Sequence, residues 1–276
     1  HLSIRRQRQM CIRDSILLNA DTVVDENWLA ELVSVAESDR SIGLCTSRLL
    51  MLDNKGIINS AGGTVHFLGF SWPRGLFLED KNQFSIVEET PLASGASLLI
   101  KRELLDTIGF LDEDYFLYME DVDYTWRARL AGYKAVFVPT SILYHKYGAS
   151  VRTYLTNMNK FYYLERNRLA TLIKNYSMKS LMLLFPALIF SELALTLCFT
   201  ALRFPLLKLK GYIWIVRNSR RILRKRRAVQ KLRIVSDRKI VELFESRFSY
   251  FVTPALVRRI LNSLMHSYWL MLIRMI

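Results

Sequence analysis

Acidic side chains set among aromatic ones distinguish the stretch FLYMEDVDYTWRARLAG, residues 116–132. Glu120, Asp121 and Asp123 lie within this stretch, flanked by tyrosines on both sides. Acids at the start of a helix interact favourably with its free N–H groups, which accounts for one or two of them without any catalysis. The aromatic surroundings would raise the pKa of a carboxyl group toward the range of a general base. A structural and a catalytic interpretation both fit these residues.

Two further polar residues follow predicted strands. Asp21, in LLNADT, stands just after the apolar run 16–18, at the kind of strand end where open α/β sheets bind ligands. Its carboxylate would take one position on a hard divalent cation, or Asn19 and Asp21 would only cap a turn. His145, in ILYHKYGAS, follows the last predicted strand. A lone histidine is more often a surface or core residue, but it would add a metal ligand if it met Asp21 in space.

The elements that must position these residues alternate between strands and helices. A helix capped by Asp25 would bury one face made of Trp28, Leu29, Leu32, Val33 and Ala36. Residues 53–92, rich in Gly, Asn, Ser and Pro, predict a loop with a short hairpin. The strand–helix–strand order predicts α/β layering with a parallel sheet. We predict strands at 16–18, 41–50, 97–100 and 134–139, the last ended by Pro139, and helices at 102–108 and 120–131, each closed by a glycine.

Charge is distributed unevenly along the 276 residues, which carry a formal net charge of +14. Residues 203–239 hold 14 lysines and arginines against one acid, Asp237. Arg217, Arg220, Arg221 and Arg224 would share one helical face of this basic tail. We therefore expect an anionic partner for the tail alone, namely an anionic membrane surface. The tail lacks the interleaved aromatics of a single-strand binder, so no nucleic-acid partner is expected.

Residues 180–202 form an apolar stretch long enough to span a bilayer, with Glu192 as its single charge. A carboxylate near the middle of a spanning helix would cost about 2.5–3.5 kcal/mol. Both flanks are basic, so the distribution of positive charge favours neither orientation. We expect this helix to lie in the cytosolic leaflet, and a buried core helix is the competing interpretation. Three scattered cysteines, Cys11, Cys45 and Cys198, indicate a reducing compartment. The predicted location is the cytoplasmic face of the cell membrane.

Taken together and in this order, these motifs resemble the family-two glycosyltransferases, in particular their rhamnosyltransferase-like branch. LLNADTVVDENWLAELV resembles the metal-binding DxD-type region of that family. SGASLLIKRELLDTIGFLDEDYFLYMEDVDYTWRARLAGYKAVFVP resembles the stretch that leads to its ED motif, and YHKYGAS resembles the histidine region that follows. The resemblance covers roughly residues 16–245 and includes ERNRLATLIKNYS. It implies a GT-A (Rossmann-like) α/β fold.

The resemblance also implies roles for individual residues. Asp21 would bind a divalent metal, Mg²⁺ or Mn²⁺, together with the diphosphate of a nucleotide-sugar donor, and Asn19 stands where many relatives have the first acid. His145 would be a further metal ligand. Asp121 would be the catalytic base and Glu120 would orient it or the acceptor. Ser94 and Gly95 would lie near the transferred sugar. The reaction implied is an inverting transfer to a lipid-linked or cell-envelope glycan.

One part of the family pattern is missing from this sequence. The family opens with strands and a helix that bind the nucleotide, and nothing upstream of Ile16 matches them. We interpret residues 1–15 as foreign sequence joined to a truncated reading frame; a native basic extension is the alternative. The expected organisation is 16–156 as the C-terminal part of a GT-A domain lacking its first strands, 157–206 as a membrane-associating helical segment, and 207–276 as a basic amphipathic helical tail.

Three other functions compete with this interpretation. A processive polysaccharide synthase is the nearest, but its Q-x-x-R-W motif is absent after the ED region. A non-catalytic basic protein that binds membrane or nucleic acid would be recognised by salt-sensitive DNA binding. An inactive truncated transferase is the third.

Overall fold

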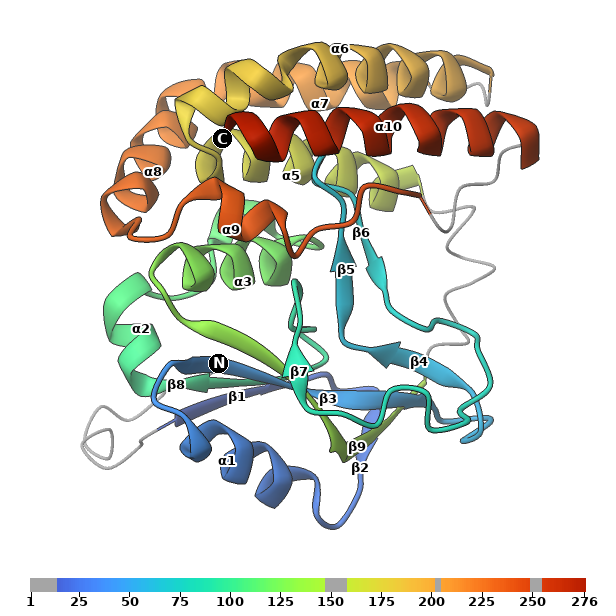
Figure 1. Cartoon of the computed structure of the whole chain (residues 1–276), viewed down its shortest axis with the longest axis vertical. Coiled ribbons are helices and arrows are strands. Elements are labelled where there is room, and N and C mark those ends of the chain that lie inside the picture. The colour runs from blue at the N-terminus through green and yellow to red at the C-terminus, as the bar shows by residue number, and fades with distance from the viewer. Residues whose placement is uncertain (1–13, 147–157, 202–204, 249–254) are drawn as a thin grey trace.

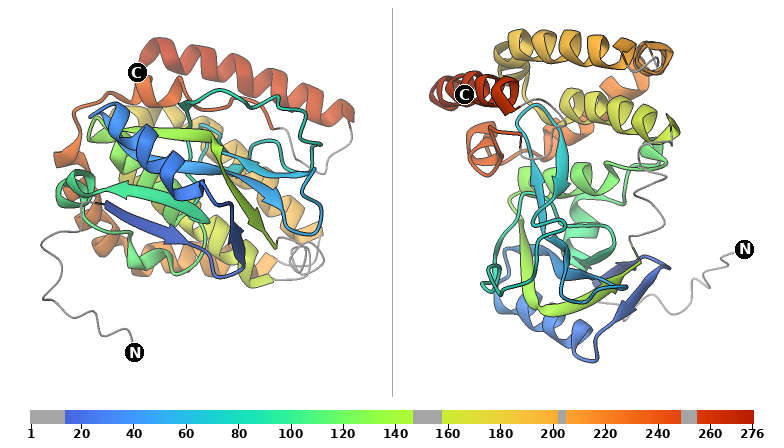
Figure 2. Two further views of the ribbon diagram at one scale, coloured as in Figure 1. Left: turned by 90° about the horizontal axis from the view of Figure 1, so that it is seen from below. Right: turned by 90° about the vertical axis from the view of Figure 1, so that its right-hand side faces the viewer.

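A computed structural model describes residues 14–146, 158–201, 205–248 and 255–276. Most of the predicted N-terminal extension, the boundary at 156/157 and residues 147–150 of the histidine region lie outside the described residues. Figure 1 shows a layered molecule, with helix α1 (Trp28–Ser38) below the main sheet and helices α2 (Arg102–Ile108) and α3 (Glu120–Leu130) above it. A second layer, made only of helices, lies beyond α3 (Figure 2).

The main sheet is mixed, with the strand order β1-β8-β3-β9-β2. β8 pairs antiparallel with both β1 and β3, β3 pairs parallel with β9, and β2 pairs antiparallel with β9. The expected parallel sheet is therefore wrong except for the β3–β9 pair, because β8 inserts between β1 and β3 in the opposite direction. These strands are β1 (Asp14–Leu18), β2 (Thr22–Val24), β3 (Ile42–Met51), β8 (Ser97–Lys101) and β9 (Lys134–His145).

Short strands occupy the region predicted as a loop with a hairpin. β4 extends the main sheet from β3, β7 pairs with β9, and β5 and β6 form a separate two-stranded ribbon. The ribbon reaches up from the sheet toward the helical layer (Figure 1). Their bounds are β4 (Ile58–Ala61), β5 (Gly63–Val65), β6 (Ser71–Pro73) and β7 (Glu88–Glu89).

Strand β9 continues through Pro139, which was expected to end it. The pairing with β3 jumps from Ser47↔Val138 to Arg48↔Ile142, so Pro139 lies in an irregular part of the ladder. A proline lacks the N–H that a regular ladder needs, and a bulge removes that requirement. The strand therefore runs on to His145, one of the candidate site residues.

Both faces of the sheet are buried, and alternate residues of each strand pack against opposite layers. Cys45 and Leu99 pack with α1, whereas Leu44, Leu98 and Ile100 pack with α2 and α3. The predicted helices at 102–108 and 120–131 are confirmed within one residue. The first helix starts later than expected, with Asn27 rather than Asp25 as its N-cap.

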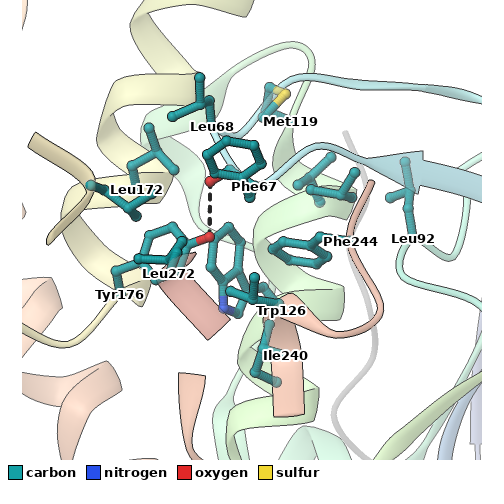
Figure 3. Close-up of a cluster of buried hydrophobic side chains, with 14 of the residues drawn as sticks. Phe67, Leu68, Leu92, Met119, Trp126, Leu172, Tyr176, Ile240, Phe244 and Leu272 are labelled. Carbon is teal, nitrogen blue, oxygen red and sulfur yellow. Dashed lines mark hydrogen bonds between the residues drawn. The ribbon is translucent and has the colours of Figure 1, made fainter. Parts of the chain in front are cut away.

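The helical layer packs on α3 and on the β5–β6 ribbon. Trp126 of α3 makes edge-to-face contacts with Tyr176 and Phe244, and the Tyr176 hydroxyl donates to the Phe67 carbonyl at 2.8 Å (Figure 3). Helix α3 is thus buried on two sides, between the sheet and this layer. The layer consists of α5 (Met158–Asn175), α6 (Met178–Ala201), α7 (Pro205–Arg217), α8 (Ser219–Leu232), α9 (Asp237–Val241) and α10 (Ala255–Met275).

The basic tail is divided between separate helices, contrary to the single face expected. Arg217 ends α7, and the chain turns at Asn218 before α8 begins. Several cations of the tail meet acids of the sheet domain: Arg221 pairs with Asp114, and Lys225 pairs with Asp112 and Asp114. The anionic membrane surface expected as the partner of the tail stays a prediction, and the charges of Arg221 and Lys225 are compensated within the molecule.

Helix α6 is the one candidate membrane span among the described residues, by length and composition. Only 22% of that apolar window is buried. Glu192 does not face outward, because its carboxylate accepts hydrogen bonds from Lys208 and Tyr212, both at 2.6 Å, and pairs with Arg168. Burial would raise the pKa of Glu192, but Arg168 and then Lys208 outweigh burial and lower it to about 2. The charged residue is therefore stabilised inside the protein.

Candidate active site

The segment before α3 holds its backbone in an unusual conformation. Phe116, Tyr118 and Met119 have positive φ angles of 60°, 63° and 72°. Such angles are rare for residues other than glycine and persist only where surrounding contacts enforce them. Asn167 of α5 provides those contacts, since its amide donates to the carbonyls of Tyr115, Leu117 and Tyr118. This clamp fixes where α3, and with it the acidic motif, begins.

Asp121 contacts the turn that precedes β8. Its carboxylate accepts hydrogen bonds from the Gly95 N–H at 3.2 Å and from the Val122 N–H at 2.8 Å. Burial raises the pKa of Asp121, and these backbone N–H groups oppose the rise without cancelling it. A Cβ added at Gly95 would lie 3.7 Å from the Asp121 side chain, an ordinary contact. The structure thus holds this carboxylate in place without neutralising it.

Glu120 lies in a similar environment. Burial, and then the negative charge of Asp121, raise the pKa of Glu120 to about 7. Its Oε2 atom is buried and has no hydrogen-bond partner among the described residues. Burial thus raises the pKa of both neighbouring carboxyl groups, toward the range in which a carboxylate acts as a general base. Such a pair can accept a proton from a substrate hydroxyl.

Asp123 points away from this pair, into the helical layer. Its carboxylate accepts hydrogen bonds from Arg127 at 2.9 Å and from Asn175 at 3.1 Å, and it lies 3.1 Å from the Lys174 ammonium. Burial raises the pKa of Asp123, but Lys174 and Arg127 outweigh burial and lower it. The third acid of the motif is therefore a structural residue.

Asp21 and His145 meet at the edge of the sheet. Thr22 pairs with His145 across β2 and β9, which brings Asp21 Oδ1 to 3.3 Å from His145 Nε2. The other ring nitrogen, Nδ1, lies 3.0 Å from Asn59 Oδ1. In the tautomer that donates from Nδ1 to Asn59, the Nε2 lone pair faces Asp21. Neighbouring ligands of one cation, at metal–ligand distances of about 2.0–2.6 Å, have such a spacing.

This pair has few further protein ligands among the residues that the structure describes. Within the part of the chain that the structure describes, no group of three His, Cys, Asp or Glu residues is arranged to hold a metal ion. An Asp–His pair at an accessible edge fits a cation that takes its remaining ligands from phosphate and water, as Mg²⁺ commonly does. Asp21 is 53% exposed, which leaves its carboxylate accessible to such a ligand.

A chain of backbone contacts connects the Asp–His edge with the carboxylate pair. The Asn19 N–H donates to the Ala96 carbonyl at 3.2 Å, and the Ala96 N–H donates to the Ser94 hydroxyl at 3.3 Å. Gly95, between Ser94 and Ala96, donates to Asp121. The structure therefore brings Asn19, Ser94, Gly95 and Asp121 to one end of β8, with Glu120 beside them, and places Asp21 two residues beyond Asn19. The catalytic and binding roles of these residues remain predictions.

Sequence reasoning missed three residues that support this site. Asn59 contacts His145, and Arg166 and Asn167 donate to carbonyls of the segment before α3. Sequence spacing does not identify Asn59, because it lies 86 residues before the histidine that it contacts, in a region that the sequence predicted as a loop with a hairpin. Arg166 and Asn167 lie in ERNRLATLIKNYS, which the family resemblance included without a role for either residue.

Comparison with known proteins decides the family. Residues 16–219 match the sequence profile described as glycosyl transferase family group 2. The chain belongs to this family. Its fold, a mixed α/β sheet with covering helices, is consistent with a GT-A domain.

Relatives of this glycosyltransferase cover parts of its chain. An N-acetylglucosaminyl-diphospho-decaprenol L-rhamnosyltransferase of Mycobacterium tuberculosis is 39% identical over 89 residues, which are 31% of this chain and 29% of the relative. The O-antigen biosynthesis protein RfbC of Myxococcus xanthus is 28% identical over 144 residues, 50% of this chain and 11% of the relative. A crystal structure of GalNAc-T7 with UDP, GalNAc and Mn²⁺ aligns with a TM-score of 0.39 and 22% identity, over 48% of this chain and 27% of that chain. The match thus spans less than a third of the mycobacterial relative.

Proposed function

We propose that this family-two glycosyltransferase moves a sugar from a nucleotide-sugar donor to a lipid-linked or cell-envelope glycan, with inversion at the anomeric carbon. The observation that carries this proposal is the carboxylate pair Glu120–Asp121, raised in pKa and held against Gly95. Other buried acids, such as Asp123, Glu165 and Glu192, are paired with cations, whereas this pair forms no ion pair with any described residue. The names of the mycobacterial and myxobacterial relatives support a glycan or lipid-linked acceptor.

Asp121 acts as the base in this proposal. Its carboxylate removes the proton of the acceptor hydroxyl as that oxygen attacks the anomeric carbon, and the nucleoside diphosphate leaves from the opposite face. Glu120 orients the acceptor hydroxyl, and its buried Oε2 atom is available for a hydrogen bond from it. Ser94 and Gly95 lie beside Asp121 and would border the transferred sugar. Inversion follows because base and leaving group lie on opposite sides of the sugar.

Asp21 and His145 would hold a divalent cation, Mg²⁺ or Mn²⁺, with Asn19 as a weak helper. When bound there, the cation supplies positive charge to the diphosphate of the donor. Asn59 keeps the imidazole oriented with Nε2 toward Asp21. The division of the chain into a partial GT-A domain at 16–156, a membrane-associating segment at 157–206 and a basic tail at 207–276 is part of the same proposal.

Membrane association is also part of the proposal. Helices α6, α7 and α10 lie side by side at the end of the molecule farthest from α1 (Figure 1). They expose many apolar side chains, and a large apolar patch marks a protein or membrane contact. Because Glu192 is paired inside the protein, we propose that α6 lies along the cytosolic leaflet. The exposed apolar residues include Met182, Phe185, Leu193 and Leu197 of α6, Leu206 and Val216 of α7, and Leu264 and Met271 of α10.

The test is sugar transfer by the full-length protein from radiolabelled nucleotide sugars to a lipid-linked acceptor, with and without a chelator. We expect transfer that the chelator removes and that Mg²⁺ or Mn²⁺ restores. Asp21→Asn should raise the metal concentration needed for half-maximal rate, and His145→Ala should do so to a smaller extent. Transfer that is unaffected by chelation would exclude the cation. If variants of Asp21, Glu120 and Asp121 all kept full transfer activity, the proposed site would be excluded.

A further inference from the structure

A cleft in the helical layer is lined by residues of α5 and α7, beside the segment that leads to the acidic motif. Its volume is about 440 Å³. Its lining combines aromatic rings with two cations, and none of the described lining residues is acidic. The lining includes Tyr162 and Tyr163 from α5 and Lys210, Ile213, Trp214 and Arg217 from α7.

Arg166 fixes the aromatic wall of this cleft. Its guanidinium lies 4.2 Å from the Trp214 ring centroid and 4.8 Å from that of Tyr163. The same guanidinium donates to the Asp114 and Tyr115 carbonyls, and its residue is only 5% exposed. The rings therefore stack on a cation that is itself held by the backbone, so the wall is preformed.

Lys210 and Arg217 make the cleft suitable for an anion. Both are exposed, and neither forms an ion pair with any residue that the structure describes. They are seven residues apart, so they lie on one face of α7 with Trp214 between them. At about 1.5 Å of rise per residue their Cα atoms are roughly 10 Å apart, within reach of one diphosphate for two long side chains.

The cleft continues into the apolar surface. Leu209, Ile213 and Val216 are exposed at i, i+4 and i+7 on α7, next to the face that carries the two cations. Helix α6, which also exposes apolar residues, contacts α7. A ligand whose phosphates bind Lys210 and Arg217 could thus extend a hydrocarbon chain over α7. Free phosphate or a soluble sugar phosphate would leave this apolar stripe unused.

The opposite end of the cleft contacts the active-site segment. The Tyr163 ring centroid lies 5.5 Å from that of Phe116, which is four residues before Glu120. Asn167, on the same helix as Tyr163, clamps the carbonyls between Tyr115 and Tyr118. A group bound in the cleft therefore lies against the segment that positions the carboxylate pair.

We propose that this cleft binds the diphosphate and the first isoprenoid units of a lipid-linked acceptor. Lys210 and Arg217 bind the phosphates, Trp214 and Tyr163 cover the junction of phosphate and lipid, and the apolar stripe of α7 receives the chain. The sugar attached to the diphosphate then projects past Phe116 toward Asp121. This inference rests on the proposed function for the identity of the acceptor, but binding at the cleft is measured without the donor.

The experiment is calorimetric titration of the full-length protein with farnesyl diphosphate, inorganic diphosphate and farnesol. Farnesyl diphosphate should bind at least about tenfold more tightly than either other probe, because only it uses both parts of the cleft. Lys210→Ala/Arg217→Ala should weaken farnesyl diphosphate binding by about tenfold or more, since charge-assisted hydrogen bonds are lost. Trp214→Ala should weaken the binding of both farnesyl diphosphate and farnesol.

A matched control removes two exposed cations that lie away from the cleft, in Arg224→Ala/Lys231→Ala. This variant should bind farnesyl diphosphate within about twofold of the unaltered protein. Equal weakening in both double variants would show general electrostatic attraction and overturn the assignment. Equal affinity for inorganic and farnesyl diphosphate would identify a free-phosphate site instead.

The proposal for the cleft and the proposed function can be disproved independently of each other. Asp121→Asn should keep farnesyl diphosphate binding and lose transfer. Lys210→Ala/Arg217→Ala should raise the acceptor KM with little change in kcat, whereas a merely structural role would lower the melting temperature and change both. Unchanged acceptor KM and unchanged farnesyl diphosphate binding in this variant would overturn the inference and leave the transferase assignment intact. Transfer that survives Asp121→Asn would contradict the base and leave the cleft in place.

Discussion

Acids at the carboxylate pair and acids in the helical layer have opposite surroundings. Glu120 and Asp121 form no ion pair with any residue that the structure describes, and both have raised pKa values. Glu165 and Glu192 are also removed from water, but Arg168 and Lys208 contact both of them and lower their pKa values. Burying an acid costs free energy unless a cation compensates its charge, so a buried acid without such a cation is a candidate functional residue. This contrast is the reason for which we propose the carboxylate pair as the active site.

The largest expected effect comes from removing the proton acceptor. Asp121→Asn should reduce the transfer rate by about 10²–10⁴-fold, because the amide keeps the shape and loses the basicity. Initial rates at saturating donor, together with donor affinity by calorimetry, would measure this loss. Donor affinity should stay unchanged. A variant that keeps most of its rate would show that Asp121 is not the base.

Replacing Asp123, the acid that is paired with cations two residues after Asp121, should change the stability of the protein. Asp123→Asn removes the carboxylate that Arg127 and Lys174 share, leaves Lys174 paired with Asp112, and should lower the free energy of unfolding by about 3–5 kcal/mol. Chemical denaturation would measure this change. Asp121→Asn, two residues away, is the matched control and should not be destabilising. If Asp123→Asn kept its stability and lost only its rate, the assignment of the two acids would be reversed.

The contrast between unpaired and paired acids can also be tested by measuring how the stability contributed by Glu120 depends on pH. Its pKa is raised from 4.5 to about 7, so the folded state binds this proton more tightly than the unfolded state. Stability from this group therefore falls as pH rises from about 4.5 to about 7, and the full penalty remains above that range. Glu120→Gln should stabilise the protein by about 1–3 kcal/mol at pH 8 and hardly at all at pH 4.5. Denaturation curves at both pH values would measure this, and equal effects at the two would exclude the raised pKa.

The cations of α8 also fall into a group that is paired with acids and a group that is not paired with any described residue. Arg221 and Lys225 pair with acids of the sheet domain, whereas four exposed cations have no ion pair with any described residue. Arg224→Ala/Lys231→Ala should weaken sedimentation with anionic vesicles by roughly thirtyfold, at about 1 kcal/mol per charge. Arg221→Ala/Lys225→Ala should lower stability and weaken vesicle binding less. Equal binding of all variants to neutral vesicles in high salt would assign the anchoring to the apolar helices. The four unpaired cations are Arg220, Arg224, Arg227 and Lys231.

Local sequence determined the helices that carry the site. Gly109 and Gly132 take positive φ angles at the ends of α2 and α3, as their positions after helical patterns predicted. The candidate residues were also named from the sequence, because the acidic motif, LLNADT and the histidine stretch occur together in the order of the family, and their roles stay predictions. Such signals act within a few residues, and for that reason they can be read without the fold.

Tertiary structure decided which strands pair and which acids are neutralised. β8 separates β1 from β3, and β9 passes Pro139, because pairing depends on partners far along the chain. Asp121 and Asp123 are the same residue type in the same motif, so the sequence does not distinguish them. Of these two, it is Asp123 that pairs with Lys174. The free energy of a buried charge depends on the cations that long-range packing places beside it, and no local pattern encodes their position.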